Sequence, residues 1–179
     1  MTDPRMVQAI HQVIRAEIRS IREVKGGDIG LSLSVETESD RYFVKYRHDL
    51  PAQSFLCEAE GLAVLRQAGG LPVPLTFYAG NIPGLTGGMI VLQWIDRGRP
   101  RADTDERLGR GLAFLHQTAS VTGKFGFHQD NYLGELPQAN RWRDSWREFY
   151  RDQRLKPLLE LADERGLLHP ARRKRLLRL

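Results

Sequence analysis

The chain has 179 residues, of which 41% are hydrophobic and 27% charged, so it is long and apolar enough to fold around a buried core. Its net charge of +5 suits an anionic ligand, but much of the excess is terminal, at positions 172–175 and 178, so we expect no nucleic-acid binding. No apolar run reaches the roughly 18 residues of a membrane span, residues 1–25 lack the apolar core of a signal peptide, and the single cysteine, Cys57, favours a reducing, cytoplasmic location.

The N-terminal segment is predicted to form one helix that ends near Lys25. Thr2 or Asp3 can cap it, and Pro4 suits its first turn. The apolar residues then recur at helical spacing, which predicts a single buried face: Val7, Ile10, Ile14, Ile18 and Ile21.

Four strands are predicted in the next part of the chain. Residues 31–36 alternate apolar with polar, and residues 42–46 are aromatic and β-branched. Residues 75–79 and 89–94 have similar character and are joined by a stretch rich in glycine and proline. Because residues 53–68 have helical periodicity, the sequence predicts an antiparallel sheet with one helix inserted before its last two strands.

The second half of the sequence is predicted to be helical. A helix begins at Asp103 or Thr104 and ends near His116, with three leucines on one face: Leu108, Leu112 and Leu115. Residues 123–138 are rich in glycine and aromatic residues and predict a loop. We expect another helix from about Asn140, broken or kinked at Pro157, and a last basic helix from about position 170.

Lys45 and Glu58 are the first candidates for chemistry. Lys45 interrupts an apolar strand, and Glu58 falls between Leu62 and Leu65 on the apolar stripe of the next helix. Protein kinases use such a pair, in which a strand lysine reaches the ATP phosphates and a helix glutamate holds it. The alternative is a partly exposed ion pair without function.

In a kinase-like frame, the strand that ends near Asp96 would be the hinge. Adenine would stack in an apolar slot and bond the carbonyl of Gln93 and the amide of Ile95. Gly26 and Gly27 would cover the phosphates, although the G-x-G-x-x-G pattern is absent. An ordinary edge strand and a plain turn are the alternatives.

Several motifs, spread over most of the chain, together resemble the fructosamine kinase family, also called ketosamine-3-kinases, which are relatives of the aminoglycoside phosphotransferases. The resemblance implies an α+β, protein-kinase-like fold, with an antiparallel-sheet N-lobe over residues 1–96 and the first helices of a helical C-lobe over residues 97–179. The N-lobe would carry an N-terminal helix and a helix like kinase αC. The motifs are Gly26-Gly27-Asp28-Ile29, Phe43-Val44-Lys45, Phe55-x-x-Glu58-Ala59-x-Gly61-Leu62, Leu108-Gly109-x-x-Leu112-Ala113-x-Leu115-His116, Phe125-Gly126-Phe127-x-x-Asp130-Asn131-x-x-Gly134, Pro137-Gln138-x-Asn140-x-Trp142 and Trp146-x-x-Phe149-Tyr150-x-x-x-Arg154-Leu155.

Members of this family use ATP and Mg²⁺ to phosphorylate the 3-hydroxyl of a ketosamine, a sugar-amine adduct that is free or part of a glycated protein. The resemblance implies that Lys45 contacts the α- and β-phosphates and that Glu58 orients it. The remaining implied ATP-binding residues cover the phosphates or form the adenine hinge: Gly26, Gly27, Gln93, Trp94 and Ile95.

The acceptor side of the family site is implied by residues 131–142. Asn131, Gln138 and Asn140 are the candidates for contact with the substrate. The simpler explanation is that these polar groups belong to loops and caps, with neighbouring aromatic residues as core.

The catalytic loop of the family, roughly His-Gly-Asp-Leu-Trp-x-Gly-Asn, and the metal-binding Asp that follows it do not occur after Arg154. We therefore expect a truncated chain that is inactive alone, with no catalytic or metal-binding residue of its own and with these groups beyond Leu179. His48-Asp49-Leu50 imitates part of a catalytic loop but lies on the wrong lobe. Residues 128–135 imitate it better, but Glu135 replaces the Mg²⁺-binding Asn, which counts against Asp130 as a base.

Two other functions remain open. One is phosphorylation of an aminoglycoside, choline or similar amino alcohol, and the other is a non-catalytic nucleotide-binding role for a kinase-like fold. The sequence does not decide the oligomeric state, but apolar helix faces after Asp103 would lose part of their cover in a short chain, which predicts self-association.

Overall fold

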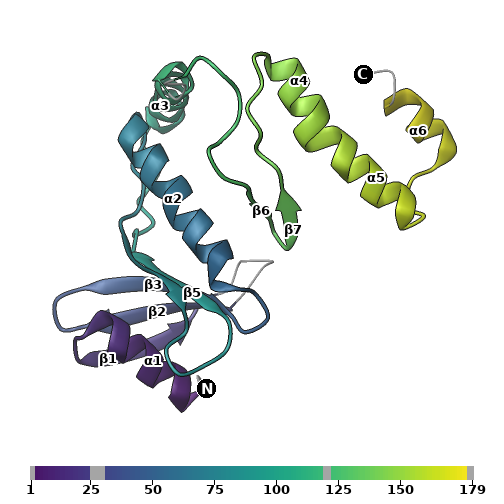
Figure 1. The fold of residues 1–179 in the computed structure, drawn as a ribbon. Coiled ribbons are helices and arrows are strands. Elements are labelled where there is room, and N and C mark those ends of the chain that lie inside the picture. The colour runs from purple at the N-terminus through teal and green to yellow at the C-terminus, as the bar shows by residue number, and fades with distance from the viewer. Residues whose placement is uncertain (1–2, 25–30, 119–121, 177–179) are drawn as a thin grey trace. The chain divides into compact units, whose positions relative to one another are not determined.

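The computed structural model describes residues 3–24, 31–118 and 122–176. The chain folds as two compact units, residues 1–119 and 120–179 (Figure 1). The predicted lobe boundary between residues 96 and 97 lies inside the first unit, and it stays a prediction.

The first unit is built on an antiparallel sheet, as the sequence predicts, but the sheet has five strands and not the four that were expected. Its strand order is β1-β2-β3-β5-β4, so β3 and β5 pair in the interior although a helix and β4 separate them in the chain. This is the small-lobe arrangement expected of a kinase-like fold. The strands are β1 (Ile18–Glu23), β2 (Leu31–Thr37), β3 (Arg41–Arg47), β4 (Thr76–Asn81) and β5 (Gly88–Gln93).

Each face of the sheet is covered by one helix. Helix α1 (Pro4–Ile14) contributes Met6, Ala9 and Ile10 to a core that contains Val44 of β3. Helix α2 (Ala52–Ala68) packs Phe55 against Ile90 and Leu92. Because side chains alternate along a strand, the neighbours of Val44 in β3 face α2, and Lys45 is one of them.

The prediction of one N-terminal helix extending to Lys25 is wrong. Helix α1 ends at Ile14, where Arg15 adopts a left-handed conformation with φ 54°, and Ile18–Glu23 forms β1. Ile18 and Ile21 match the helical period, but β-branched residues also suit a strand. Pairing with β2 along the sheet edge therefore decides their conformation.

Helix α3 (Thr104–Thr118) completes the first unit by packing closely on the turn after α2. A Cβ added at Gly111 would lie 2.5 Å from the carbonyl oxygen of Gly70, so the two backbones touch where only glycine fits. The side-chain hydroxyl of Thr118 donates to the carbonyl of Ala68 at 3.3 Å, which fixes the far end of the helix. The predicted helix is therefore confirmed.

The second unit begins where a loop was expected and instead contains a short antiparallel hairpin. After this hairpin the chain reaches Ser145 and enters a helix. That helix contains a π-helical turn, η1 (Arg151–Leu155). The other elements are β6 (Asn131–Leu133), β7 (Leu136–Gln138), α4 (Trp146–Tyr150), α5 (Lys156–Glu164) and α6 (Pro170–Leu176).

Two sequence expectations for this unit are corrected. Asn140 does not start a helix: residues 139–142 are not helical, and Arg143 forms a β-bridge with Phe125. The helix starts at Trp146, where the hydroxyl of Ser145 accepts a hydrogen bond from the Glu148 amide at 3.2 Å. Of the break or kink expected at Pro157, the break does not occur, since the preceding turn widens to π-helical geometry and α5 continues through the proline.

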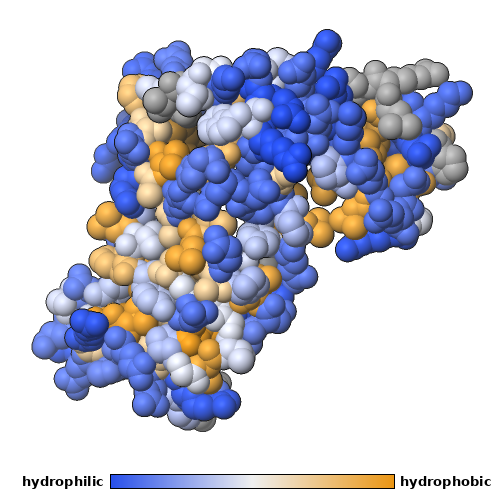
Figure 2. All heavy atoms as spheres, viewed as in Figure 1, coloured by the Kyte–Doolittle hydropathy of each residue, from blue (hydrophilic) through white to orange (hydrophobic). Residues whose placement is uncertain are grey.

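Several large apolar side chains lie on the surface. Leu108 and Leu112 of α3 are exposed by 49% and 38%, so the predicted leucine face is only partly covered. Figure 2 shows hydrophobic patches that interrupt the hydrophilic surface of the face in view. Among the described residues, none of the helices combines the length and hydrophobicity that crossing a membrane would require.

Candidate nucleotide site

Lys45 and Glu58 form the ion pair that the sequence predicts. The ammonium of Lys45 on β3 donates to Oε2 of Glu58 on α2 at 2.6 Å, across the sheet face that α2 covers. The side chains are exposed by 28% and 34%, and such pairs stabilise a fold by only about 0 to 1 kcal/mol. Their contribution to stability is therefore small, and both groups remain accessible to a ligand.

An apolar pocket of about 480 Å³ lies at the end of the same sheet. Phe43 comes from β3, the strand that carries Lys45, and Leu92 comes from the neighbouring strand β5. Its volume falls in the range of small-ligand pockets, and its walls suit a flat aromatic group. The lining residues are Val24, Phe43, Pro74, Leu92, Gln93, Trp94, Ile95 and Arg97. The structure therefore brings the three predicted hinge residues together on one pocket.

The hydrogen bonds around Gln93 favour a hinge with an accessible carbonyl. The Gln93 amide donates to the carbonyl of Leu75 at 2.8 Å, as in a regular ladder. The return bond from the Leu75 amide goes to the side-chain oxygen of Gln93 at 3.3 Å. Because the Gln93 side chain takes this donor, the Leu75 amide does not occupy the Gln93 carbonyl.

Arg41 holds the next part of the predicted hinge, and no sequence pattern had singled out this residue. Its guanidinium lies 4.0 Å from the centre of the Trp94 ring, and its backbone carbonyl accepts from the Trp94 amide at 3.2 Å. The indole nitrogen of Trp94 donates to Asp96 at 2.8 Å, and Asp96 also lies 3.6 Å from Arg41. These contacts fix the backbone on both sides of Ile95.

A carboxylate on β2 orients Arg41 from the other side. Oε1 of Glu36 lies 3.3 Å from Nε of Arg41, and the hydroxyl of Ser20 donates to Oε2 of Glu36 at 2.7 Å. The hydrogen bond from Ser20, with the positive charges of Arg22 and Arg41, holds the pKa of Glu36 below its usual value. Glu36 is therefore charged at neutral pH and pairs with Arg41.

The remaining expectations concern the phosphate loop and the metal ligands, and no metal ligand was predicted within this chain. Gly26 and Gly27 lie outside the described residues, so their role stays a prediction. Within residues 3–24, 31–118 and 122–176, no three His, Cys, Asp or Glu side chains converge as metal ligands. Cys57 is buried, in agreement with its predicted place in the core.

The predicted substrate residues occupy three different environments in the second unit. Asn131 and Gln138 lie opposite each other in the β6–β7 hairpin. The Asn131 side-chain oxygen is buried without a hydrogen-bond partner among the described residues, and Gln138 lines a pocket of about 220 Å³. Asn140 is 2% exposed and hydrogen-bonded on several sides, which fits a scaffold role better than direct substrate contact. Substrate contact by all three stays a prediction.

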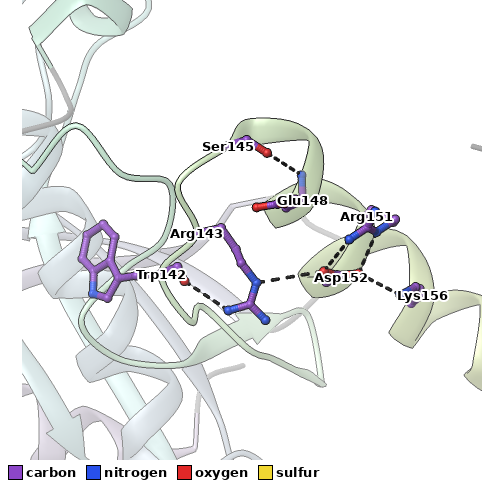
Figure 3. Close-up of polar contacts among 7 residues, drawn as sticks. All are labelled: Trp142, Arg143, Ser145, Glu148, Arg151, Asp152 and Lys156. Atoms are coloured by element: carbon purple, nitrogen blue, oxygen red, sulfur yellow. Dashed lines mark hydrogen bonds and ion pairs between the residues drawn. The ribbon is translucent and has the colours of Figure 1, made fainter.

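A cluster of charges surrounds Asp152 on the outer side of the π-helical turn (Figure 3). Arg151 donates to both carboxylate oxygens at 2.8 and 3.0 Å, and Lys156 lies 2.9 Å from one of them. These contacts, led by the hydrogen bonds from Arg151, hold the pKa of Asp152 far below its usual range. Arg143 approaches from the bridged strand at 4.0 Å, so the cluster ties the helix to the loop before it.

The two segments that imitate a catalytic loop have structural contacts of their own. His48 lies in the turn between β3 and α2, where its Nδ1 is 3.1 Å from the carbonyl of Thr86, and Asp49 pairs with Arg47. Oδ1 of Asp130 accepts a hydrogen bond from the Asn140 amide at 2.8 Å. Both carboxylates therefore serve the local fold.

Comparison with known proteins places this geometry in a family. The family model described as fructosamine kinase matches residues 3–178. The chain is 37% identical over 147 residues to the chloroplastic protein-ribulosamine 3-kinase of Arabidopsis thaliana, covering 82% of this chain and 44% of the relative. It is 36% identical over 149 residues to a Synechocystis protein named "Probable ketoamine kinase", covering 83% of this chain and 50% of the relative.

A solved structure supports the same relationship. A crystal structure from Thermobifida fusca, assigned as a fructosamine-3-kinase, superposes with a TM-score of 0.77 at 28% identity. The match covers 96% of this chain and 58% of that one. The chain thus spans about half the length of the curated relatives it matches. Its sequence and its fold show that the chain belongs to the fructosamine kinase family.

Proposed function

We propose that this chain forms the nucleotide-binding part of an ATP-dependent kinase that phosphorylates the 3-hydroxyl of a ketosamine. The observation that carries the proposal is the 2.6 Å contact between Lys45 and Glu58 on the sheet that also forms the hinge pocket. The names of the relatives, a ribulosamine kinase and a ketoamine kinase, support the acceptor class. Within that class, the acceptor is a small sugar-amine or a glycated protein.

In the proposed mechanism, adenine stacks against the pocket wall that Phe43 and Leu92 form. The Gln93 carbonyl accepts from the adenine amino group, and the Ile95 amide donates to a ring nitrogen. Lys45 donates to oxygens of the α- and β-phosphates, while Glu58 keeps its ammonium at the right place. Gly26 and Gly27 would cover the phosphates.

The chemical step needs groups beyond this nucleotide site. The acceptor hydroxyl attacks the γ-phosphorus, its proton passes to a base, and ADP leaves. Mg²⁺, held by groups of the whole protein, would offset the negative charge that develops on the transferred phosphoryl group. We place the base and the metal ligands after Leu179 in the whole protein, so residues 1–179 bind nucleotide without turnover. The buried Cys57, the single cysteine of the chain, fits a reducing location such as the cytoplasm.

The test is an ATP-dependent phosphorylation assay on the protein encoded by the complete gene. Fructosamine and ribulosamine adducts of lysine are the acceptors, and the product is identified as the sugar 3-phosphate by ³¹P NMR. Matched 3-deoxy adducts are the control, and they should not react. If neither adduct turns over while kanamycin or choline does, the acceptor class is wrong.

A further inference from the structure

A row of polar side chains crosses three strands of the sheet and ends beside the proposed hinge. Ser20 of β1 lies opposite Glu36 of β2, and Glu36 lies opposite Arg41 of β3 in the antiparallel register. Residues that lie directly opposite each other in such a ladder place their side chains on the same face of the sheet. The three polar side chains therefore share one face, and Arg41 is the member of the row next to the hinge.

The same face of the sheet carries the candidate nucleotide site. Side chains alternate along β3, so Arg41, Phe43 and Lys45 project from one face. Phe43 lines the apolar pocket, and Lys45 pairs with Glu58. Because Phe43 lies between the other two along the strand, the polar row borders the pocket on the side away from the proposed phosphate position.

Two side chains on β2 fix the guanidinium of Arg41. Its Nε donates to the hydroxyl oxygen of Ser34 at 2.9 Å, and Oε1 of Glu36 lies 3.3 Å from the same nitrogen. Ser34 is only 3% exposed, so its hydroxyl has little access to water. The hydroxyl of Ser20 donates to Oε2 of Glu36 at 2.7 Å and holds that carboxylate in place. Groups on β1 and β2 thus set the position of the guanidinium.

Arg41 carries this order to the hinge through its backbone and its side chain. Its carbonyl accepts from the Trp94 amide at 3.2 Å, and its guanidinium lies 4.0 Å from the centre of the Trp94 ring. Asp96 completes the arrangement, because it accepts from the indole nitrogen at 2.8 Å and lies 3.6 Å from Arg41. Trp94 is therefore held both at its amide and at its ring.

The Trp94 amide determines where the Gln93 carbonyl points. The two groups belong to the same peptide bond, and in a planar trans peptide the N–H and the C=O point in opposite directions. Because the amide is bonded to Arg41 of β3, the Gln93 carbonyl is directed away from β3. A rotation of this peptide would break the bond to Arg41 and turn the carbonyl toward β3.

The orientation of this peptide decides which purine the hinge accepts. Adenine presents an amino donor beside a ring-nitrogen acceptor, which match the Gln93 carbonyl and the Ile95 amide. Guanine presents a carbonyl acceptor beside an N–H donor, so acceptor would face acceptor and donor would face donor. A site whose polar groups are left unpaired by the wrong ligand discriminates strongly against that ligand. A peptide free to rotate would lose this discrimination.

We propose that Ser34 and Glu36 set the preference for adenine over guanine, as positioning residues that act through Arg41 on the hinge peptide. Neither residue is among the described residues that line the pocket, so neither acts by contact with the base. Ser20 serves the same role one step further away, by holding Glu36. The inference rests on the proposed function, since it assumes that the pocket binds a purine nucleotide.

The test compares adenosine with guanosine, because neither carries a phosphate that could mask the contribution of the base. Both nucleosides are titrated calorimetrically into the wild-type chain, Ser34→Ala and Glu36→Met. The wild type should prefer adenosine by about tenfold or more. In both variants this preference should fall by about two- to fivefold, the range expected for a loosened cation–π contact of Arg41. The control is Glu38→Met, whose exposed carboxylate pairs with Arg19 outside the network, and it should keep the wild-type preference.

Two further measurements show whether these residues act through Arg41. The double variant Glu36→Met/Arg41→Gln should bind adenosine no more weakly than Arg41→Gln alone, because effects within one network are not additive. The indole N–H signal of Trp94 in ¹H–¹⁵N spectra, assigned with Trp94→Phe, reports the ring that Arg41 contacts. It should shift in Ser34→Ala and Glu36→Met and stay in place in the control variant.

Three results would overturn the inference. They are a wild-type preference for adenosine in both Ser34→Ala and Glu36→Met, additive losses in the double variant, and an unshifted Trp94 signal in the two single variants. If the wild type binds neither nucleoside, the proposed function itself fails and the inference falls with it. A wild type that prefers adenosine, with variants that keep this preference, would leave the proposed function in place and refute the positioning role alone.

Discussion

The guanidinium of Arg41 lies 4.0 Å from the centre of the Trp94 ring, and the backbone carbonyl of Arg41 accepts the Trp94 amide. This relationship joins β3 to the segment after β5, where the adenine hinge is proposed. It acts together with the bond from Trp94 to Asp96, so the hinge backbone is ordered before a ligand arrives. Preorganisation of this kind reduces the entropy lost on binding.

Replacing Arg41 with glutamine should weaken adenosine binding. The cation–π contact is worth about 0.5 to 1 kcal/mol at a partly exposed site, which corresponds to a loss of roughly two- to fivefold. Calorimetric titration of adenosine into the variant measures this loss. Arg19→Gln, which removes an exposed ion pair with Glu38, is the control and should bind like the wild type. An unchanged affinity in folded Arg41→Gln would contradict a hinge-ordering role.

Glu58→Gln should reduce ADP affinity far more than stability. The pair with Lys45 is partly exposed, so its removal should change the free energy of unfolding by no more than about 1 kcal/mol. Without the carboxylate, the lysine is no longer held near the phosphates. Urea unfolding and an ADP titration of the same sample make the comparison. If the variant loses several kcal/mol of its free energy of unfolding but keeps its ADP affinity, the ion pair stabilises the fold and does not bind nucleotide.

Gly111→Ala should destabilise the first unit. The new Cβ would lie 2.5 Å from the Gly70 carbonyl oxygen, and overpacking of this kind costs about 1 to 3 kcal/mol. Gly109→Ala on the same helix is the matched control, because no atom lies within 4 Å of its added Cβ. That control should stabilise the helix by about 0.5 to 1 kcal/mol. The two urea midpoints should therefore move in opposite directions, and equal midpoints would refute the close contact.

Asp152 should make stability depend on pH below neutrality. Arg151 and Lys156 hold its folded pKa far below the unfolded value of about 3.9. A lowered folded pKa gives stability that is fully present above the unfolded pKa and is lost as pH falls toward the folded one. Stability of the wild type should therefore fall from about pH 4 downward. The Asp152→Asn variant should not show this loss of stability at low pH. If the variant and the wild type have identical profiles of stability against pH, Asp152 is not paired with Arg151 and Lys156.

Sequence patterns predicted the ion pair of the candidate nucleotide site because it follows from local order in the chain. Lys45 is a charged residue in an apolar strand, and Glu58 is a charged residue on the apolar face of the next helix. Each therefore needs a partner of opposite charge, and each is the nearest candidate for the other. The hinge followed from the place of β5 in the element order. Arg41 could not be found in this way, because its contact with Trp94 depends on the pairing of β3 with β5 across an intervening helix and strand.

The remaining errors come from tertiary contacts that override local patterns. Ile18 and Ile21 fit a helix by spacing but pair with β2. Ser145 followed by Glu148 is a sequence signal for a helix N-cap. The apolar periodicity from Asn140 led instead to a predicted start that is too early. Nothing in the sequence around Pro157 distinguishes a break from a π-helical turn, because the difference depends on Arg154 reaching the Gln153 carbonyl.

The central claim is that Lys45 binds nucleotide phosphate in the hinge-bearing unit, and comparing ADP with adenosine tests it most directly. Both ligands are titrated into the wild-type chain, Lys45→Met and the control Lys124→Met. The account predicts that Lys45→Met loses about 10- to 100-fold in ADP affinity, as for one charged hydrogen bond, and keeps its adenosine affinity. Equal ADP affinity in Lys45→Met and the wild type would contradict it.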